Sequence, residues 1–134
     1  MIFVDSSFIL ALFNRNDVVN NRKAELLLKA IPEFDVIPKA INNVVLNEVL
    51  NNLKKSYYAG KREEIIDYLF SMDEIYFVDE EAYSRALFLY RKYNYEVNFS
   101  DFLIVLSMRD HGISDILSFD SDFSRIKNIN NICI

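Results

Sequence analysis

Short apolar runs alternate with longer segments whose hydrophobic residues recur every three or four positions, which predicts strands alternating with helices. Runs rich in β-branched and aromatic residues are expected strands, at about residues 2–4, 35–38, 75–78, 116–119 and 132–134. The amphipathic segments are expected helices, at about residues 6–13, 18–31, 42–57, 61–72, 80–93 and 101–110. This alternation implies right-handed crossovers, and hence an α/β fold: a three-layer α/β/α sandwich around a mainly parallel sheet of about five strands.

Residues that start or stop helices lie at the expected boundaries. Ser6 or Ser7 can cap the first helix, and Asp79 can cap the helix that begins at about residue 80. Pro32 ends the second helix, and Gly112 follows the helix that ends at about residue 110.

Length and composition indicate one globular domain over residues 1–134, with 51% hydrophobic and 26% charged residues. No apolar run approaches the roughly 20 residues that a membrane span needs. The lone Cys133 excludes an internal disulfide, and the single His111 argues against histidine-rich zinc centres. The opening segment lacks a basic start and carries Asp5 within its apolar run, so we expect a cytoplasmic protein whose chemistry uses carboxylates, hydroxyls or amines.

Acidic residues occur at the points where ligands bind in α/β sheets. Asp5 directly follows the first strand, and Asp120 and Asp122 follow the fourth. Asp101 opens the helix that leads into that fourth strand, and Glu48 lies beside the apolar stripe of the third helix, which predicts partial burial. Because the carboxyl ends of parallel strands meet at one edge of a sheet, these acids are expected to converge.

Several carboxylates in one place repel one another and raise their pKa values, so such a group persists mainly when a divalent cation neutralises it. Oxygen ligands alone select hard ions such as Mg²⁺ or Mn²⁺. These ions typically serve phosphate substrates by activating a water and shielding charge in an in-line displacement. The acids therefore predict cleavage of a phosphodiester bond.

The net charge of −5 has the opposite sign to that of most nucleic-acid binders. If four acids are metal ligands, the remaining balance is 16 acidic to 15 basic residues, so the total charge argues only weakly against a nucleic-acid substrate. Tyr57 and Tyr58 either stack on bases or pack on the flank of the domain. The following basic residues either track an RNA backbone or are simply solvated: Arg15, Lys54, Lys55, Lys61 and Arg62.

Four short motifs, spread over the whole chain, resemble those of the PIN-domain ribonucleases, and within that family the VapC-type toxins of bacterial and archaeal type II toxin–antitoxin pairs. In order along the sequence they are FVDSS at residues 3–7, LNEVL at 46–50, SDFLI at 100–104 and LSFDSDF at 117–123. Any one of them is common, but four in this order are fairly specific.

The resemblance implies a Mg²⁺- or Mn²⁺-dependent endoribonuclease whose ligand acids are Asp5, Glu48, Asp101 and Asp120. Asp122 either assists a second metal or caps the turn before Phe123. The resemblance also implies hydroxyl support, from Ser6 or Ser7 after the first acid and from Ser118, where the family often has threonine. The implied partners are an RNA substrate, a second copy in a homodimer, and an antitoxin whose tail blocks the acidic cleft.

Other interpretations remain open. Each acid has an ordinary role as a helix cap, a surface charge or a turn former. An aspartate-based phosphatase or phosphoacceptor domain also places an acid after its first strand, but a phosphatase of the haloacid type needs a second Asp where Ser7 stands, and a phosphoacceptor domain needs a lysine after a late strand. A non-catalytic PIN-fold module that binds RNA or protein is the remaining alternative.

Overall fold

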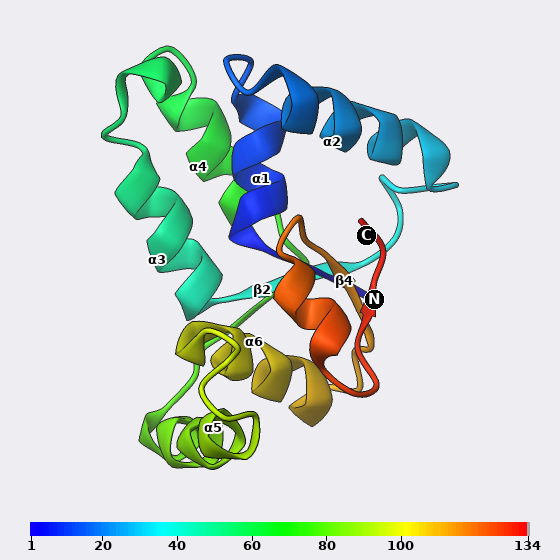
Figure 1. Cartoon of the computed structure of the whole chain (residues 1–134). Coiled ribbons are helices and arrows are strands. Elements are labelled where there is room, and N and C mark those ends of the chain that lie inside the picture. The colour runs from blue at the N-terminus through cyan, green and yellow to red at the C-terminus, as the bar shows by residue number, and fades with distance from the viewer. Residues whose placement is uncertain (134) are drawn as a thin grey trace.

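The computed structural model describes residues 1–133 and contains a five-stranded sheet with the order β3-β2-β1-β4-β5 (Figure 1). The strands are β1 (Ile2–Val4), β2 (Lys39–Asn42), β3 (Glu74–Tyr76), β4 (Asp115–Leu117) and β5 (Asn130–Asn131). Every strand pair within the described residues is parallel. The predicted α/β fold with a mainly parallel sheet of about five strands is therefore confirmed.

Helices cover both faces of the sheet. They are α1 (Ser6–Phe13), α2 (Val18–Ala30), α3 (Asn43–Asn52), α4 (Arg62–Phe70), α5 (Glu80–Lys92) and α6 (Phe99–Asp110), with the 3₁₀ turns η1 (Ser56–Tyr58) and η2 (Ser121–Arg125). In Figure 1, α1 to α4 lie above the sheet, and α5 and α6 lie below it.

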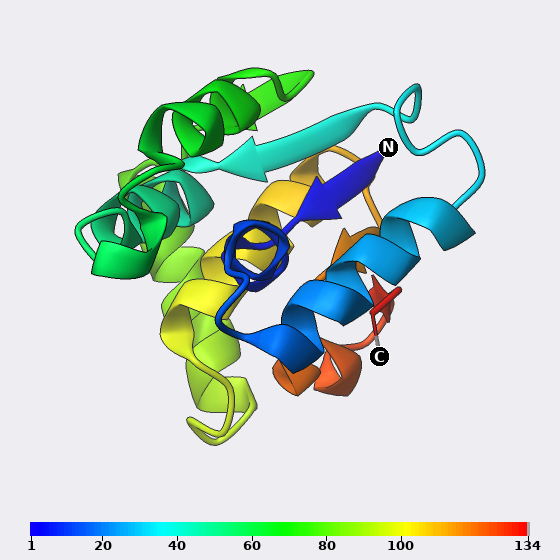
Figure 2. The ribbon, with the colours of Figure 1, turned by 90° about the horizontal axis from the view of Figure 1, so that it is seen from above.

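The first strand lies at the centre of the sheet and is completely buried, as its run of apolar residues predicts. β1 pairs with β2 on one side and with β4 on the other, and Val4 is in register with Leu117. The Asp5 amide then donates to the Leu117 carbonyl oxygen at 3.0 Å. Figure 2 shows α1 end-on just beyond the tip of β1. The residues after β1 and β4 therefore meet at one edge of the sheet.

Two predicted strands are wrong in position. The second was expected at residues 35–38, but β2 begins only at Lys39, because residues 33–37 form a helical turn in which the Val36 and Ile37 amides donate to the Glu33 carbonyl oxygen. The fifth was expected at residues 132–134, but β5 is Asn130–Asn131. Residues 132 and 133 form a turn, and residue 134 lies outside the described residues.

Some helix ends also differ from the predictions. The third helix ends at Asn52 rather than near residue 57, and η1 follows it. At α1 the N-cap position belongs to Asp5, so the expected capping role of Ser6 or Ser7 is wrong. Asp79 does cap α5, since its side chain accepts from the Ala82 amide, and Gly112 follows α6 with a φ of +68°.

None of the helices in residues 1–133 has both the length and the apolar character that crossing a membrane requires.

Candidate active site

Asp5 is a buried carboxylate held by two hydroxyl groups. Only 5% of the residue is exposed, and its Oδ2 accepts from Ser118 Oγ at 2.7 Å and from Ser7 Oγ at 2.9 Å. Burial raises the Asp5 pKa above its ordinary value, and the bonds from Ser118 and Ser7 offset part of that rise. The hydroxyls therefore stabilise the ionised form and fix the orientation of the carboxylate.

The same two hydroxyls tie Asp5 to the loop after β4. Ser7 Oγ accepts from the Phe119 amide at 2.9 Å, and Ser118 Oγ accepts from the Asp120 amide at 3.0 Å. Ser6 differs from Ser7, because within residues 1–133 its hydroxyl makes no hydrogen bond to Asp5. Its backbone hydrogen bond does help to lower the Asp5 pKa. Of the two serines predicted to support Asp5, the hydroxyl of Ser7 is therefore the one in contact.

Asp101 lies in the first turn of α6, a helix whose residues 101–108 are all buried. A helix that is largely apolar around its circumference is driven into the interior, and here it carries a carboxylate with it. The Asp101 Oδ2 atom is inaccessible to solvent and has no hydrogen-bond partner within residues 1–133. Burial, followed by the charges of Asp120, Asp5 and Asp122, raises the Asp101 pKa to about 8.

Three carboxylates come together at this edge of the sheet. Asp101, Asp120 and Asp122 each offer an oxygen, and these oxygens all lie within 4.8 Å of one another. Asp120 Oδ1 also accepts from the Asp122 amide at 2.9 Å, so Asp120 caps η2. Of the two roles considered for Asp122, capping of this turn therefore belongs to Asp120 instead. Asp122 is 3.9 Å from Arg125, a pair at the long end of ion-pair distances.

The properties of this cluster fit a divalent cation. Its donors are all oxygens, which suit hard ions such as Mg²⁺ and Mn²⁺. One oxygen of Asp101 is buried without a partner, and the raised pKa values of Asp101 and Asp5 show that nearby positive charge is insufficient to offset their burial. A bound cation would give the buried Asp101 oxygen a partner and would supply positive charge beside both carboxylates.

Glu48 lies at the periphery of the site. Its charge raises the Asp5 pKa, so the two carboxylates are close enough to interact. However, Glu48 is exposed rather than partly buried as predicted, and it is not a member of the three-acid group. The position on α3 explains this, because Val45 and Val49 occupy the buried stripe and leave Glu48 on the side that faces solvent.

Asn42 positions the helices that carry two of the acids, and the sequence interpretation missed it. It is completely buried at the end of β2, and its Oδ1 accepts from the Val44 and Val45 amides at the start of α3. Its Nδ2 donates to the Leu103 carbonyl oxygen and to Ser107 Oγ, both on α6. Asn42 therefore joins the helix of Glu48 to that of Asp101. An asparagine just before an amphipathic segment is a capping signal, so the sequence indicates the bonds of Asn42 to the start of α3 but not its bonds to α6.

Asn131 is a second missed contact. It lies on β5, is 8% exposed, and donates from Nδ2 to the Asp120 carbonyl oxygen at 3.1 Å. This bond holds the loop that presents Asp120 and Asp122. No local pattern signals it, because the two partners belong to different elements.

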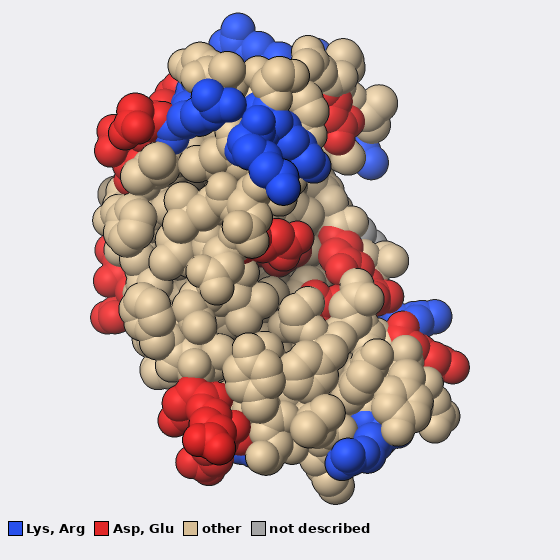
Figure 3. All heavy atoms as spheres, turned by 90° about the vertical axis from the view of Figure 1, so that its left-hand side faces the viewer, with Lys and Arg blue, Asp and Glu red and all other residues tan. Residues whose placement is uncertain are grey.

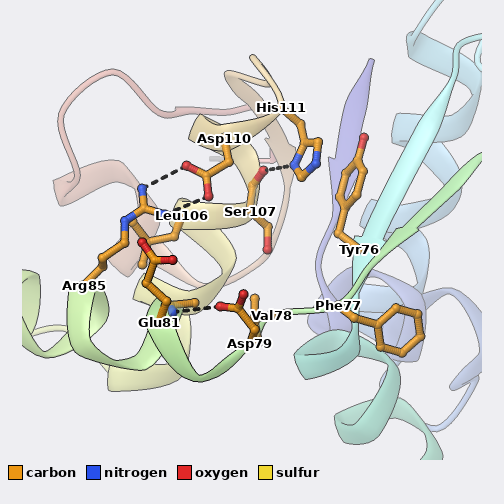
Figure 4. Close-up of a pocket in the computed structure, with 11 residues that line it drawn as sticks. Tyr76, Phe77, Val78, Asp79, Glu81, Arg85, Leu106, Ser107, Asp110 and His111 are labelled. Atoms are coloured by element: carbon orange, nitrogen blue, oxygen red, sulfur yellow. Dashed lines mark hydrogen bonds and ion pairs between the residues drawn. The ribbon is translucent and has the colours of Figure 1, made fainter.

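A second polar region lies at the other end of α6 (Figure 4). The hollow has a volume of about 160 Å³, and Arg85 forms a two-pronged ion pair with Asp110 there, at 2.8 and 2.9 Å. The His111 ring stacks on Tyr76 with centroids 3.6 Å apart. Asp110 is nine positions along α6 from Asp101, so this hollow lies about 14 Å along the helix axis from the acid cluster. It is not part of the candidate site.

Comparison with known proteins agrees with the arrangement of the fold. The sequence profile of the PIN domain family matches residues 2–129, which is nearly the whole chain. No curated protein matches the chain.

Solved structures of toxin proteins share this architecture. VapC20 of Mycobacterium tuberculosis, described as a toxin that cleaves the sarcin-ricin loop, is 27% identical with a TM-score of 0.75, over 93% of this chain and 94% of that one. A toxin–antitoxin complex from Klebsiella pneumoniae (19% identity, TM-score 0.70, 96% and 95% coverage) shares the fold. VapBC2 from Rickettsia felis bound to a DNA fragment from its promoter also shares the fold (19% identity, TM-score 0.65, 98% and 97% coverage). The chain belongs to the PIN domain family, and its structure is similar over almost its full length to those of VapC toxins.

Proposed function

We propose that this protein is a divalent-metal-dependent endoribonuclease, a VapC-like toxin that hydrolyses RNA phosphodiester bonds. The observation that carries the proposal is the buried, unpartnered oxygen of Asp101, surrounded by the charges of Asp120, Asp5 and Asp122. A carboxylate kept in such a place without a cation costs folding free energy, so its presence is explained by a ligand of opposite charge.

We assign Asp101 and Asp120 to hold Mg²⁺ or Mn²⁺, with Asp122 as an additional oxygen donor. We add Asp5, which lies outside the three-acid group but is close enough for its charge to raise the Asp101 pKa. When bound, the ion supplies charge neutralisation at phosphorus and acidifies a coordinated water. Ser118 and Ser7 keep one oxygen of Asp5 engaged and thereby aim the other. We assign to Glu48, which is exposed at the edge of the site, the role of orienting or deprotonating the attacking water. Hydrolysis in this sense leaves a 5′-phosphate and a 3′-hydroxyl.

The proposed partners follow from the same likeness. VapC20 is described as a toxin that cleaves the sarcin-ricin loop, and the Klebsiella structure is a toxin–antitoxin complex, so we include an RNA substrate and a cognate antitoxin for this chain. A cytoplasmic location agrees with an RNA substrate. We also propose a homodimer, since α5 leaves Tyr83, Leu87 and Phe88 between 40% and 66% exposed.

The direct test is cleavage of a labelled RNA by the purified protein in the presence of Mg²⁺ or Mn²⁺. We expect Asp101→Asn to lower the rate at least about 10²-fold, because it removes one carboxylate charge from the cation site. Asp110→Asn is the matched control, since it removes an acid from the same helix outside the cluster, and its rate should stay within about twofold of the parent.

Equal cleavage by the parent and by Asp101→Asn would contradict the assignment of the site. Binding of RNA without any cleavage in Mg²⁺ or Mn²⁺ would support the non-catalytic alternative instead. A rate that is unchanged by EDTA would contradict the metal requirement alone.

A further inference from the structure

We infer that a basic corner of the molecule binds the phosphodiester backbone of single-stranded RNA and leads it to the acid cluster, an inference that rests on the proposed function. The basic corner consists of residues from the α1–α2 turn and the α3–α4 connection: Arg15, Lys54, Lys55, Lys61 and Arg62.

One hydrogen bond joins these two segments, and a second holds the α3–α4 connection itself. Lys61 Nζ donates to the Phe13 carbonyl oxygen at the end of α1, at 3.2 Å. The Arg62 side chain donates from Nε to the Leu53 carbonyl oxygen at the end of α3, at 2.6 Å. Cations at the carboxyl ends of helices are favourable because they oppose the helix dipole. These two residues therefore build the corner.

The remaining cations are free for a ligand. The ion pairs within residues 1–133 are Arg85–Asp110 and Arg125–Asp122, so no member of the basic corner has a carboxylate within 4.0 Å. Lys54 and Lys55 are exposed, and their ammonium groups make no hydrogen bond to any of the described residues, 1–133. In a protein of net charge −5, a group of unneutralised cations is a local exception that attracts anions.

The corner adjoins the acid cluster. Glu48 interacts with Asp5, and α3 continues from Glu48 for about 6 Å to its end at Asn52, two residues before Lys54. Figure 3 shows basic side chains at the top of this face, where the α3–α4 connection lies, directly above acidic side chains near the centre. Since the acids repel RNA, binding at the corner supplies the attraction that holds an adjoining phosphate near them.

An exposed aromatic ring favours nucleic acid over an acidic protein segment as the ligand. Tyr57 follows Lys55 closely in sequence and is 39% exposed. Its ring packs edge-on against the buried Tyr58 with centroids 4.6 Å apart, which holds it in place. Aromatic rings beside a basic groove are how proteins bind single strands, because every base offers a face for stacking.

The test measures binding of a labelled single-stranded RNA by full-length protein carrying Asp101→Asn, between about 50 and 200 mM salt. Replacing Lys54 and Lys55 by Gln in this background should reduce the slope of log K against log salt by about 1.4, which corresponds to two lost phosphate contacts. Tyr57→Ala should weaken binding at least about fivefold without changing the slope.

The control replaces Lys29, in the last turn of α2, and Lys127, which follows η2, by Gln, which makes the same change in net charge at two exposed positions outside the basic corner. This control should keep the parent slope. Equal slopes for the corner and control variants would overturn the inference. The inference would also be overturned if the corner variant lost binding to polyglutamate and kept its binding to RNA. That result would assign the corner to an acidic protein segment.

Cleavage by the protein with Asp101 intact separates the two proposals. If that protein cleaves RNA and the salt slopes are equal, the corner inference alone fails. If it cleaves nothing, while replacing Lys54 and Lys55 reduces the slope of log K against log salt, the RNA-binding surface stands and the nuclease assignment fails.

Discussion

The two ends of α6 carry aspartates with opposite electrostatic settings. At the start of the helix, Asp101 is 6% exposed, and burial raises its pKa to about 8. At the end, Asp110 forms a two-pronged hydrogen bond with Arg85 that lowers the Asp110 pKa. The two aspartates belong to one helix, so the difference comes from what the fold places around each of them.

The two ends differ in the sign of the charge beside each aspartate. At the Asp110 end, a cation from α5 satisfies the acid, and the pair is half exposed, as surface ion pairs usually are. At the Asp101 end, the nearest charges are other carboxylates. Assembling buried carboxylates beside one another costs folding free energy, and pKa values raised in this way are typical of functional sites.

Binding of Mn²⁺ should distinguish the two ends most strongly. Mn²⁺ at a hundredfold excess over its Kd should raise the free energy of unfolding of the parent by about 2.7 kcal/mol. Most of this gain should disappear in Asp101→Asn and persist in Asp110→Asn, as measured by thermal unfolding with and without the ion. The same gain in Asp101→Asn would mean that the ion binds elsewhere.

Without metal, Asp101→Asn should stabilise the protein at alkaline pH. The folded-state pKa of about 8 lies above the ordinary value of 3.8, so the stability contributed by protonated Asp101 is complete below about pH 4 and is lost as the pH rises through about 8. At pH 9 in EDTA, Asp101→Asn should therefore exceed the parent by on the order of 2 kcal/mol in urea unfolding, and the difference should shrink toward pH 4. Asp110→Asn should not gain stability at pH 9, and a gain of the same size in this control would contradict the argument.

Breaking the Arg85 pair should have the smallest effect. Arg85→Ala leaves Asp110 exposed to water, so the loss in free energy of unfolding should be at most about 1 kcal/mol, measured at low salt where surface pairs contribute most. RNA cleavage should remain within about twofold of the parent. A large loss of cleavage would show that the hollow of Figure 4 takes part in the activity.

Prediction of the fold succeeded where hydrophobic periodicity is strong and failed at short elements. The run Phe102–Leu106 is apolar enough to predict a buried helix, and α6 is indeed buried along this run. In contrast, the second strand was expected at residues 35–38, whereas β2 begins just after Pro38. Short strands depend on their pairing partners, and β2 is defined by its register with β1 and β3 rather than by its own residues.

The sequence by itself determined that Asp5 follows a buried strand and that Asp101 lies at the start of a buried helix, because the apolar runs that form these two elements are local patterns. That was enough to single out Asp5 and Asp101, although their assignment as metal ligands stays a prediction. Only the tertiary structure decided that Ser118, 113 positions along the chain from Asp5, donates to it, and that Glu48 stays exposed. The physical reason is that burial and charge at a site depend on every element packed around it, and contacts at such separation have no signature in local periodicity.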